Sequence, residues 1–350
     1  MTFAPACGRA FRFQGPAPPM PKTETVILRE LLAREGAWVS GAALAARLGI
    51  SRVAVWQRME RLRAAGFAFE AVRARGYRLA GRPATLHQPL LEALLRVRSR
   101  GFWLQVLDEV DSTNDEAARQ LAAGRPAPFA VLARRQIRGK GRLGRVWHSE
   151  SPVSLYASLG FRPEVEPGRM QTFTLWMGVN LCELLANITG VEPGIKWPND
   201  IMFEGRKAGG LLTEARIDAD RISDLILGIG LNVNPPPRGW PAELAGRATT
   251  LADAGGRPVD LNRLAAALIG RVLLAYEAFR EGRHLATFGD LWARFDTLRG
   301  RPVALLEGGR RHVGVVRGVD DEGSLLLADA RGRIGRFRAG EVTIEKTPPA

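Results

Sequence analysis

The sequence predicts an α+β protein of several domains, with a winged helix-turn-helix at the N-terminus, a mixed α/β domain in the centre and an SH3-like β-barrel at the C-terminus. The first observation is length, because 350 residues exceed the roughly 100–200 residues of a single domain. The second is a basic segment with helical spacing near the N-terminus. The third is a change after Gly300 to short β runs separated by glycine and aspartate.

Composition excludes several classes of protein. Apolar residues make up 46% of the chain and charged residues 25%, which is typical of a globular protein and not of a disordered or fibrous one. No uninterrupted apolar stretch approaches the roughly 20 residues of a membrane span, so we expect no membrane partner. Cys7 and Cys182 form no disulfide or metal-binding pattern. This cysteine usage predicts a protein of the reducing cytoplasm.

Residues 1–21 differ from the rest of the chain. They contain five prolines and little periodicity, and they lack the apolar region of about 7–15 residues that marks a secretory signal. We therefore expect a disordered tail, within which Met20 is an alternative start. The predicted domains that follow are a winged helix-turn-helix over 22–80, a central domain over 86–299 and the barrel over 300–346.

Residues 22–80 follow the order of a winged helix-turn-helix. Ile27, Leu28, Leu31 and Leu32 recur at helical spacing and predict a first helix. A second short helix ends at Gly49, and Ser51 is placed to cap a third helix with an apolar inner stripe and a basic outer face. Two β runs, Phe67–Glu70 and Tyr77–Leu79, then flank turn residues in the manner of a wing. Turn, recognition helix and wing in this order indicate DNA binding.

Charge supports the same interpretation. Between Gly41 and Ala80 the chain has eight arginines and two acidic residues, so this short segment holds +6 of the net charge of +14. The alternative fold is a small helical bundle with a solvated basic face. The alternative explanation of the charge is composition, because 45 of the 50 basic residues in the chain are arginines. The residues that we expect to contact DNA are Ser51, Arg52, Trp56, Arg58, Arg61 and Arg75.

After a predicted linker over Gly81–Pro89, strand-like and helix-like segments alternate as in a mixed α/β domain. The predicted helices are Thr113–Ala122, Gln171–Asn187, Leu261–Arg280 and Leu285–Arg294. The predicted strands are Phe102–Leu107, Phe129–Ala133, Ser154–Phe161, Ile195–Trp197, Gly210–Ile217 and Asp224–Val233. The barrel strands are Pro302–Leu306, Arg311–Arg317, Ser324–Ala328, Arg333–Phe337 and Val342–Ile344.

The strongest local signal is the run from Gly139 to Trp147, GKGRLGRVW, in which glycines alternate with cations. It matches G-x-G-x-x-G, but a dinucleotide fingerprint needs glycines that open a helix within a βαβ unit. Here the run leads toward Pro152 and another strand. A flexible loop with several positive charges suits a ligand that carries carboxylate and phosphate groups.

Three further segments combine polar and small residues. Asp111–Asn114 precedes a helix, although Thr113 with Glu116 also has the spacing of a purely structural capping box. Lys196–Asp200, KWPND, places a lysine between two apolar strand residues, so its side chain is expected to project from the opposite face into a cleft. Gly228–Asn234, GIGLNVN, has two glycines in a strand, which indicates close approach by another part of the chain or by a ligand.

Together, DSTN, GKGRLGRVW, KWPND with RKAGG, and GIGLNVN resemble the biotin–protein ligases in order and spacing. The likeness extends over about residues 24–346, and the two flanking domains are similar to those of the bifunctional subgroup that also represses biotin-synthesis genes. It implies a central domain of the class II synthetase and biotin ligase type. It also implies a reaction of biotin with ATP to give biotinyl-5′-AMP, with Mg²⁺ as activating ion, followed by transfer to a lysine of a carboxylase carrier domain.

The resemblance also implies roles for individual residues. Lys196 and Arg142 would be catalytic, and no protein-bound metal is expected. The biotin-binding residues would be Ser112, Thr113, Asn114, Gln136, Lys140, Gly141, Arg142, Lys196, Gly228 and Gly230. The ATP-binding residues would be Lys140, Arg142, Trp147, Asn199, Lys207 and Asn232.

Expected partners are a biotin carboxyl carrier protein, operator DNA and a second copy of the chain in the adenylate-bound state. Two alternatives stay open. A lipoate–protein ligase of the same fold explains the central domain but not the flanking domains. A biotin-sensing DNA-binding regulator with weak or no ligase activity is the other, and Lys140 favours it, because the family usually has arginine there. Lysine keeps the charge but loses the bidentate fork, so we expect looser retention of the adenylate.

Overall fold

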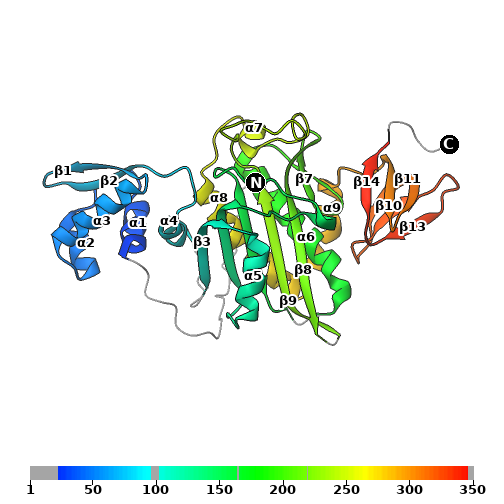
Figure 1. Cartoon of the computed structure of the whole chain (residues 1–350), viewed down its shortest axis with the longest axis horizontal. Helices are drawn as coiled ribbons and strands as arrows, with labels where there is room; N and C mark the ends of the chain where they lie inside the picture. The colour runs from blue at the N-terminus through cyan, green and yellow to red at the C-terminus, as the bar shows by residue number, and fades with distance from the viewer. Residues whose placement is uncertain (1–22, 96–101, 164, 219, 346–350) are drawn as a thin grey trace.

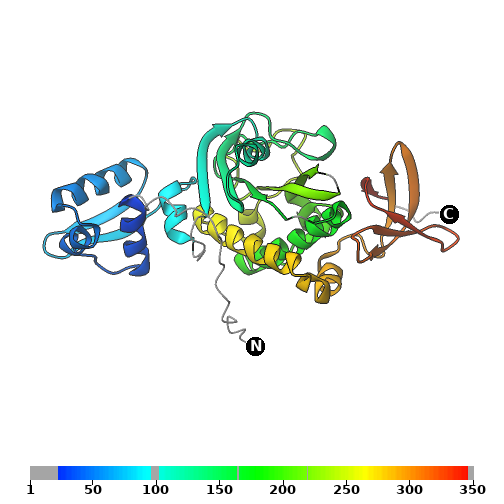
Figure 2. The same ribbon diagram turned by 90° about the horizontal axis from the view of Figure 1, so that it is seen from below.

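The computed structural model describes residues 23–95, 102–163, 165–218 and 220–345, which form three bodies in a row (Figures 1 and 2). The N-terminal domain lies at one end and the C-terminal strands at the other, with the large central sheet between them. Predictions for the tail over 1–21 fall outside the described residues. Within the described ranges, no helix is long and apolar enough to cross a membrane.

The N-terminal domain has the predicted three helices and two-stranded wing. Ser51 caps the third helix by accepting a hydrogen bond from the backbone N of Ala54 at 3.1 Å, and Gly49 ends the second helix with φ +63°. The antiparallel wing is confirmed, with strands slightly longer than predicted. The elements are α1 (Thr23–Ala33), α2 (Gly41–Leu48), α3 (Arg52–Ala64), β1 (Ala68–Val72) and β2 (Gly76–Gly81).

The predicted linker over Gly81–Pro89 is partly wrong, because α4 (Gln88–Leu94) begins inside it. This helix packs against both α1 and the central helix α8 (Leu261–Arg280). Asn262, at the start of α8, accepts a hydrogen bond from the backbone N of His87 at 2.9 Å. Since α4 has only seven residues, its apolar pattern is too short to be recognised in the sequence.

The central domain is built on a seven-stranded sheet in the order β3-β4-β5-β9-β8-β7-β6, in which only the β3–β4 pair is parallel. The predicted strands are confirmed with shifted ends, and β7 was not predicted because it has only four residues and begins two positions after the proline of KWPND. The strands are β3 (Trp103–Val110), β4 (Phe129–Gln136), β5 (Leu155–Phe161), β6 (Gly194–Lys196), β7 (Asp200–Phe203), β8 (Arg206–Asp218) and β9 (Arg221–Leu231).

Helices cover the two faces of this sheet (Figure 2). Phe129 and Val131 of β4 pack with α5 (Thr113–Ala122) on one face, while Ala130 and Leu132 belong to the larger core with α6 (Met170–Thr189) and α8. The predicted single helix over Leu285–Arg294 is wrong. The chain there forms η3 (Arg283–Ala286) and then α9 (Phe288–Phe295), which are separated at Thr287; α7 (Leu251–Gly255) is a further short helix.

The C-terminal domain has the five predicted strands in the order β13-β12-β11-β10-β14. It lies against the central domain, where the indole N of Trp197 donates a hydrogen bond to the backbone O of Gly323 at 3.2 Å. That contact connects the KWPND segment to the barrel-like domain. The strands are β10 (Pro302–Glu307), β11 (Arg310–Val319), β12 (Leu325–Ala328), β13 (Ile334–Phe337) and β14 (Glu341–Ile344).

Candidate active site

A cavity of about 300 Å³ opens between the glycine-rich loop, the strands of the central sheet and the C-terminal domain. All ten residues predicted to bind biotin line it, as do all the residues predicted to bind ATP except Asn232. Four segments that are far apart in the sequence thus meet around one space. We take this cavity as the candidate active site.

One end of the cavity is a buried network of uncharged polar groups, in which the Asn114 amide also donates to the carboxylate of Glu214 at 2.6 Å. Gln136 Oε1 accepts hydrogen bonds from the backbone N of Thr113 at 2.7 Å and from its hydroxyl at 3.0 Å. The Ser158 hydroxyl donates to Asn114 Oδ1 at 2.6 Å and lies 2.8 Å from Thr113 Oγ1. Because these side chains are buried and hydrogen-bonded to one another, this end is already rigid before a ligand arrives.

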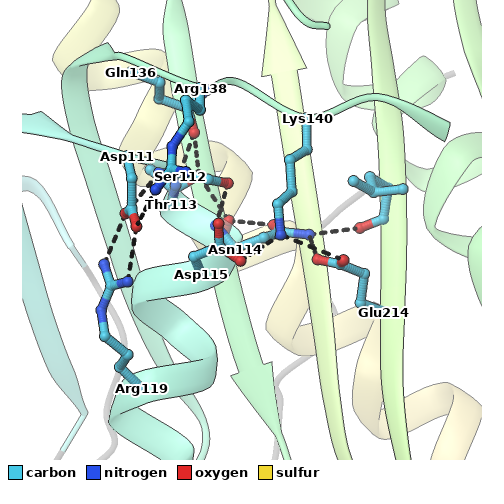
Figure 3. Close-up of polar contacts among 12 residues, drawn as sticks. Asp111, Ser112, Thr113, Asn114, Asp115, Arg119, Gln136, Arg138, Lys140 and Glu214 are labelled. Atoms are coloured by element: carbon cyan, nitrogen blue, oxygen red, sulfur yellow. Dashed lines mark hydrogen bonds and ion pairs between the residues drawn. The ribbon is translucent and has the colours of Figure 1, made fainter. Parts of the chain in front are cut away.

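The capping-box interpretation of Thr113 is wrong. Ser112 is the residue that caps α5, and its Oγ accepts from the backbone N of Asn114 at 3.3 Å. Thr113 is the first residue of α5 (Figure 3); its hydroxyl donates to Gln136, and the residue lines the cavity. Asp111 precedes the capping residue Ser112. Arg119 donates to both carboxylate oxygens of Asp111 at 2.7 and 2.9 Å and holds the pKa of that carboxyl well below its usual range.

The two strand glycines are explained by the close approach of other side chains. A Cβ at Gly228 would lie 2.2 Å from Oδ1 of Asn114, and a Cβ at Gly230 would lie 2.6 Å from the indole ring of Trp147. Both distances are too short for any real side chain. The glycines of β9 therefore allow Asn114 and Trp147 to reach the sheet, and both residues line the cavity.

The glycine-rich loop folds back on itself as a small hairpin. The backbone N of Trp147 donates to Gly139 O at 2.9 Å and the N of Gly141 to Arg145 O at 2.7 Å. At the tip, Leu143 has φ +56°, a conformation that is rare for a residue with a side chain. The loop thus presents its cations toward the cavity.

Two cations of this loop are held differently. The Lys140 ammonium forms an ion pair with Asp115 of α5 and lies 4.0 Å from Glu214 of β8 (Figure 3); the hydrogen bond to Asp115 raises the pKa of Lys140. Arg142 is more enclosed, and burial lowers the pKa of its guanidinium. In Figure 3, Lys140 reaches from the loop across to α5, close to Asn114.

The strand side of the cavity contributes two lysines. Ile195 and Trp197 are buried, whereas Lys196 between them lines the cavity, as its alternation in the strand predicts. Lys207 of β8 also lines it, with its ammonium 2.5 Å from Asp200 and 5.4 Å from the ring centre of Trp147. Together with Arg142, these lysines make this side of the cavity cationic.

The C-terminal domain completes the wall, which the sequence did not predict. Residues 340–343 line the cavity, and Glu341 forms an ion pair with Arg145 of the glycine-rich loop at 2.5 Å. About 200 residues separate these two side chains in the chain, so no local pattern signals the contact. Asp200 also lines the cavity. It belongs to the KWPND motif, in which only Lys196 and Asn199 were predicted to bind a ligand.

Comparison with known proteins agrees with this geometry. The model of the Biotin/lipoate A/B protein ligase family matches residues 106–232, and that of the HTH domain matches residues 23–78. The chain is 34% identical over 311 residues to the bifunctional ligase/repressor BirA of Bacillus subtilis, covering 87% of this chain and 94% of that protein. The chain belongs to the biotin–protein ligase family.

Two further likenesses extend this result. The bifunctional ligase/repressor BirA of Escherichia coli is 30% identical over 331 residues, covering 92% of this chain and 98% of that protein. The structure of the biotin protein ligase from Aquifex aeolicus in complex with biotin and ATP has a TM-score of 0.60 and 31% identity, covering 70% of this chain and 99% of that chain. The central and C-terminal parts therefore have the biotin ligase fold, preceded by a helix-turn-helix domain.

Asn232 lies outside the cavity wall of this ligase, although it was predicted to bind ATP. Its buried side-chain amide donates to the backbone O of Lys207 at 3.4 Å and of Thr249 at 3.2 Å. These bonds tie β8 to the segment before α7, and Lys207 is the residue at the junction. A contact of Asn232 with the nucleotide stays a prediction.

Most of the residues predicted to contact DNA lie exposed on α3 or the wing, and one is engaged within the domain. Arg52, Trp56 and Arg61 are exposed on the outer face of α3, beside the capping residue Ser51. Arg75 of the wing lies 5.0 Å above the ring of Trp38. Arg58 is different, because its guanidinium is paired with Glu24 of α1 at 2.9 Å.

Proposed function

We propose that this chain catalyses ATP-dependent attachment of biotin to a lysine of a carrier protein. The observation that carries the proposal is a single cavity in which a buried, uncharged hydrogen-bonding network meets five cationic side chains of the glycine-rich loop and the strands. The neutral end suits the ureido ring of biotin, which needs hydrogen-bond partners but brings no charge. The cationic end suits the biotin carboxylate and the phosphates of ATP. Likeness to a ligase that binds both molecules supports this assignment.

In the first step, an oxygen of the biotin carboxylate attacks the α-phosphorus of ATP. A new O–P bond forms, the bond to the bridging oxygen breaks, and pyrophosphate leaves with the electron pair. Negative charge increases on the phosphate oxygens as this happens, so fixed cations lower the barrier. We assign this stabilisation to Lys196 and Arg142, while Lys140 and the backbone at Gly141 close over the adenylate.

In the second step, the uncharged amine of a carrier lysine attacks the carbonyl carbon of biotinyl-5′-AMP. A C–N bond forms, AMP leaves with the oxygen, and the nitrogen loses a proton to solvent. Here Ser112, Thr113, Asn114 and Gln136 would hold the biotin ring, since they form the fixed end of the cavity. Keeping the ring still while the acyl carbon is attacked is the main contribution of that end.

The nucleotide would lie along the other wall. Trp147, Asn199 and Lys207 are proposed as its partners, with Mg²⁺ entering on the phosphates of ATP. Lys207 is already paired with Asp200, so a phosphate would compete for a charge that the protein holds in place. We further propose that the five C-terminal strands form an SH3-like barrel whose residues around Glu341 close the cavity.

The helix-turn-helix domain adds a second activity, repression of transcription by a biotin-adenylate-bound homodimer. The basic outer face of α3 and the wing support DNA binding, and a dimer would present two such faces to two half-sites. This part of the proposal depends on occupancy of the cavity, because the ligand would couple biotin supply to DNA binding.

The test is transfer of biotin to a purified biotin carboxyl carrier domain, read by intact-mass spectrometry. With biotin and Mg²⁺–ATP we expect one biotinyl group per carrier, and none on a carrier whose acceptor lysine is replaced by arginine. Lipoate in place of biotin is expected to give no product. No transfer by a protein that binds biotin and DNA would contradict the ligase proposal and favour a biotin-sensing regulator.

A further inference from the structure

We propose that the outer face of α3 reads A·T base pairs in the major groove through three uncharged side chains, Val53, Trp56 and Gln57. This inference rests on the proposed DNA binding and names the part of the surface that distinguishes sequences. The three residues are spaced i, i+3 and i+4, so they share one face of the helix. We call them the reading centre.

The reading centre is unusual in its exposure. Val53 is 64% exposed and Trp56 52% exposed, and Gln57 is also exposed. The opposite stripe of the same helix is fully buried in the domain core. The helix therefore does not need these apolar side chains for its own packing, and they are left in contact with water, which favours their burial against a partner.

The charges around the reading centre identify the kind of partner. Arg52 precedes it and Arg61 follows it by about one turn, and in the described part of the chain neither guanidinium takes part in an ion pair. Two other arginines of α3 are already engaged: Arg58 with Glu24, and Arg63 with Glu60. Unengaged cations thus lie at both ends of an uncharged centre.

The wing supplies further positive charge beside α3. Arg75 and Arg78 lie over the ring of Trp38 at 5.0 and 4.9 Å, which braces the wing against the body of the domain. Arg73 at the wing tip is exposed. A cationic rim around an uncharged centre matches duplex DNA, in which phosphates border the base edges on both sides of the groove.

The chemistry of the reading centre then selects the bases. Thymine presents a methyl group in the major groove, and an apolar side chain recognises it by contact. Adenine presents N6–H and N7 side by side, and a glutamine amide pairs with both. Val53 and Trp56 are therefore assigned to thymine methyl groups, and Gln57 to adenine. A surface that only attracted phosphates would place cations here instead.

The first experiment finds the preferred sequence. The full-length protein, with biotin and Mg²⁺–ATP, is used to enrich binders from a pool of random-sequence duplexes, which are then sequenced. We expect enrichment of A·T pairs at two symmetric positions. The winning duplex is then remade with deoxyuridine for thymidine, which removes only the methyl groups. Affinity should fall about four-fold for each contacted methyl, the factor for burying one methyl-sized apolar group.

Variants separate reading from attraction. Trp56→Ala should lose the part of the preference for thymine over uracil that Trp56 contributes and keep the part that Val53 contributes, with the salt dependence of binding unchanged. Arg61→Ala should weaken binding to all duplexes and lower the slope of log affinity against log salt by about one unit. Ile217→Ala, at an exposed apolar residue of the β8–β9 hairpin, is the matched control and should change neither quantity. Each variant is checked for biotin transfer to confirm folding.

Four results would overturn the proposal. Salt-dependent binding without sequence enrichment, or equal affinity for thymine and uracil duplexes, would refute base reading while leaving DNA binding intact. No binding to any duplex would remove the repressor function as well. The protein could instead bind anionic lipid vesicles in preference to DNA, with a blue shift of tryptophan fluorescence that Trp56→Ala abolishes. That result would assign the surface to membranes.

Discussion

The two ends of the cavity are built in opposite ways. The neutral end consists of Thr113, Gln136, Ser158 and Asn114, which are buried and hydrogen-bonded to one another. At the cationic end, charged side chains from separate strands are paired with each other, such as Lys207 of β8 with Asp200 of β7. The side chains of the first end are fixed by hydrogen bonds to one another, whereas those of the second end are held by ion pairs that a ligand can replace.

The difference in energy between the two ends explains what each can do. A buried polar group that loses its partner costs about 1–3 kcal/mol, so the neutral end resists rearrangement. An exposed ion pair contributes only about 0–1 kcal/mol, so Lys140, Lys207 and Arg145 can exchange their acidic partners for an anionic ligand at little cost. Specificity for the biotin ring is thus expected from the first end, and response to phosphate from the second.

The largest effect is expected at the cationic end. Lys196→Met removes a charge that faces the developing negative charge of adenylation, so the rate of adenylate formation should fall about 10²–10³-fold. Lys196→Arg keeps the charge and should recover part of the rate. The measurement is single-turnover formation of biotinyl-5′-AMP, with thermal unfolding as the control. A rate within three-fold of the native value in Lys196→Met would show that this lysine is not catalytic.

A smaller effect is expected from the neutral end. Thr113→Val keeps the shape of the side chain but leaves Ser158 and Gln136 each with one partner fewer. Biotin affinity without ATP should fall about 5- to 150-fold, which corresponds to 1–3 kcal/mol, as measured by titration calorimetry. Ser223→Ala is the control, because the Ser223 hydroxyl donates to Arg216 O on an exposed hairpin away from the cavity. Unchanged affinity in Thr113→Val would show that the network does not contact biotin.

Glycine substitutions test the packing that joins the two ends. Gly230→Ala would place a Cβ 2.6 Å from the Trp147 ring, so the free energy of unfolding should fall by about 1–3 kcal/mol as the ring is displaced. Gly270→Ala in α8 has no atom within 4 Å of the added Cβ and should leave stability unchanged or raise it by up to about 1 kcal/mol. Chemical denaturation of both variants gives the comparison; equal stabilities would contradict it.

The smallest effect concerns the loop. Lys140→Arg restores a planar fork with several donors, so the dissociation rate of biotinyl-5′-AMP should fall by a few-fold. Asp115→Asn, which removes the partner of Lys140, isolates the contribution of the ion pair. Dissociation is followed by chase with unlabelled biotin and ATP. Equal dissociation rates for the native protein and Lys140→Arg would show that lysine at this position does not weaken retention of the adenylate.

The sequence predicted most of the site because its motifs are local. Ser112, Thr113 and Asn114 are consecutive, and Lys196 lies between two apolar strand residues, so alternation alone points it to the cavity. Strand glycines likewise predicted close approach, although the partners, Asn114 and Trp147, came only with the fold.

What the sequence did not predict depends on distant contacts. The pairing of Arg145 with Glu341 and the engagement of Arg58 by Glu24 join separate elements, and no periodicity encodes them. The position of Asn232 outside the cavity wall was not predicted for the same reason. Its bonds to Lys207 and Thr249 depend on how β8 and the segment before α7 meet. Helix α4 and strand β7 were missed because they are shorter than the patterns that reveal such elements.

The most direct test of a cavity with one neutral and one cationic end is exchange of pyrophosphate into ATP by the purified protein with Mg²⁺. It needs no carrier and reports only the adenylation step. Exchange that requires biotin and does not occur with lipoate is the predicted result, because the neutral end should select the ring while the cationic end serves any carboxylate. Equal exchange with lipoate, or none with biotin despite measurable biotin binding, would contradict this division of the site.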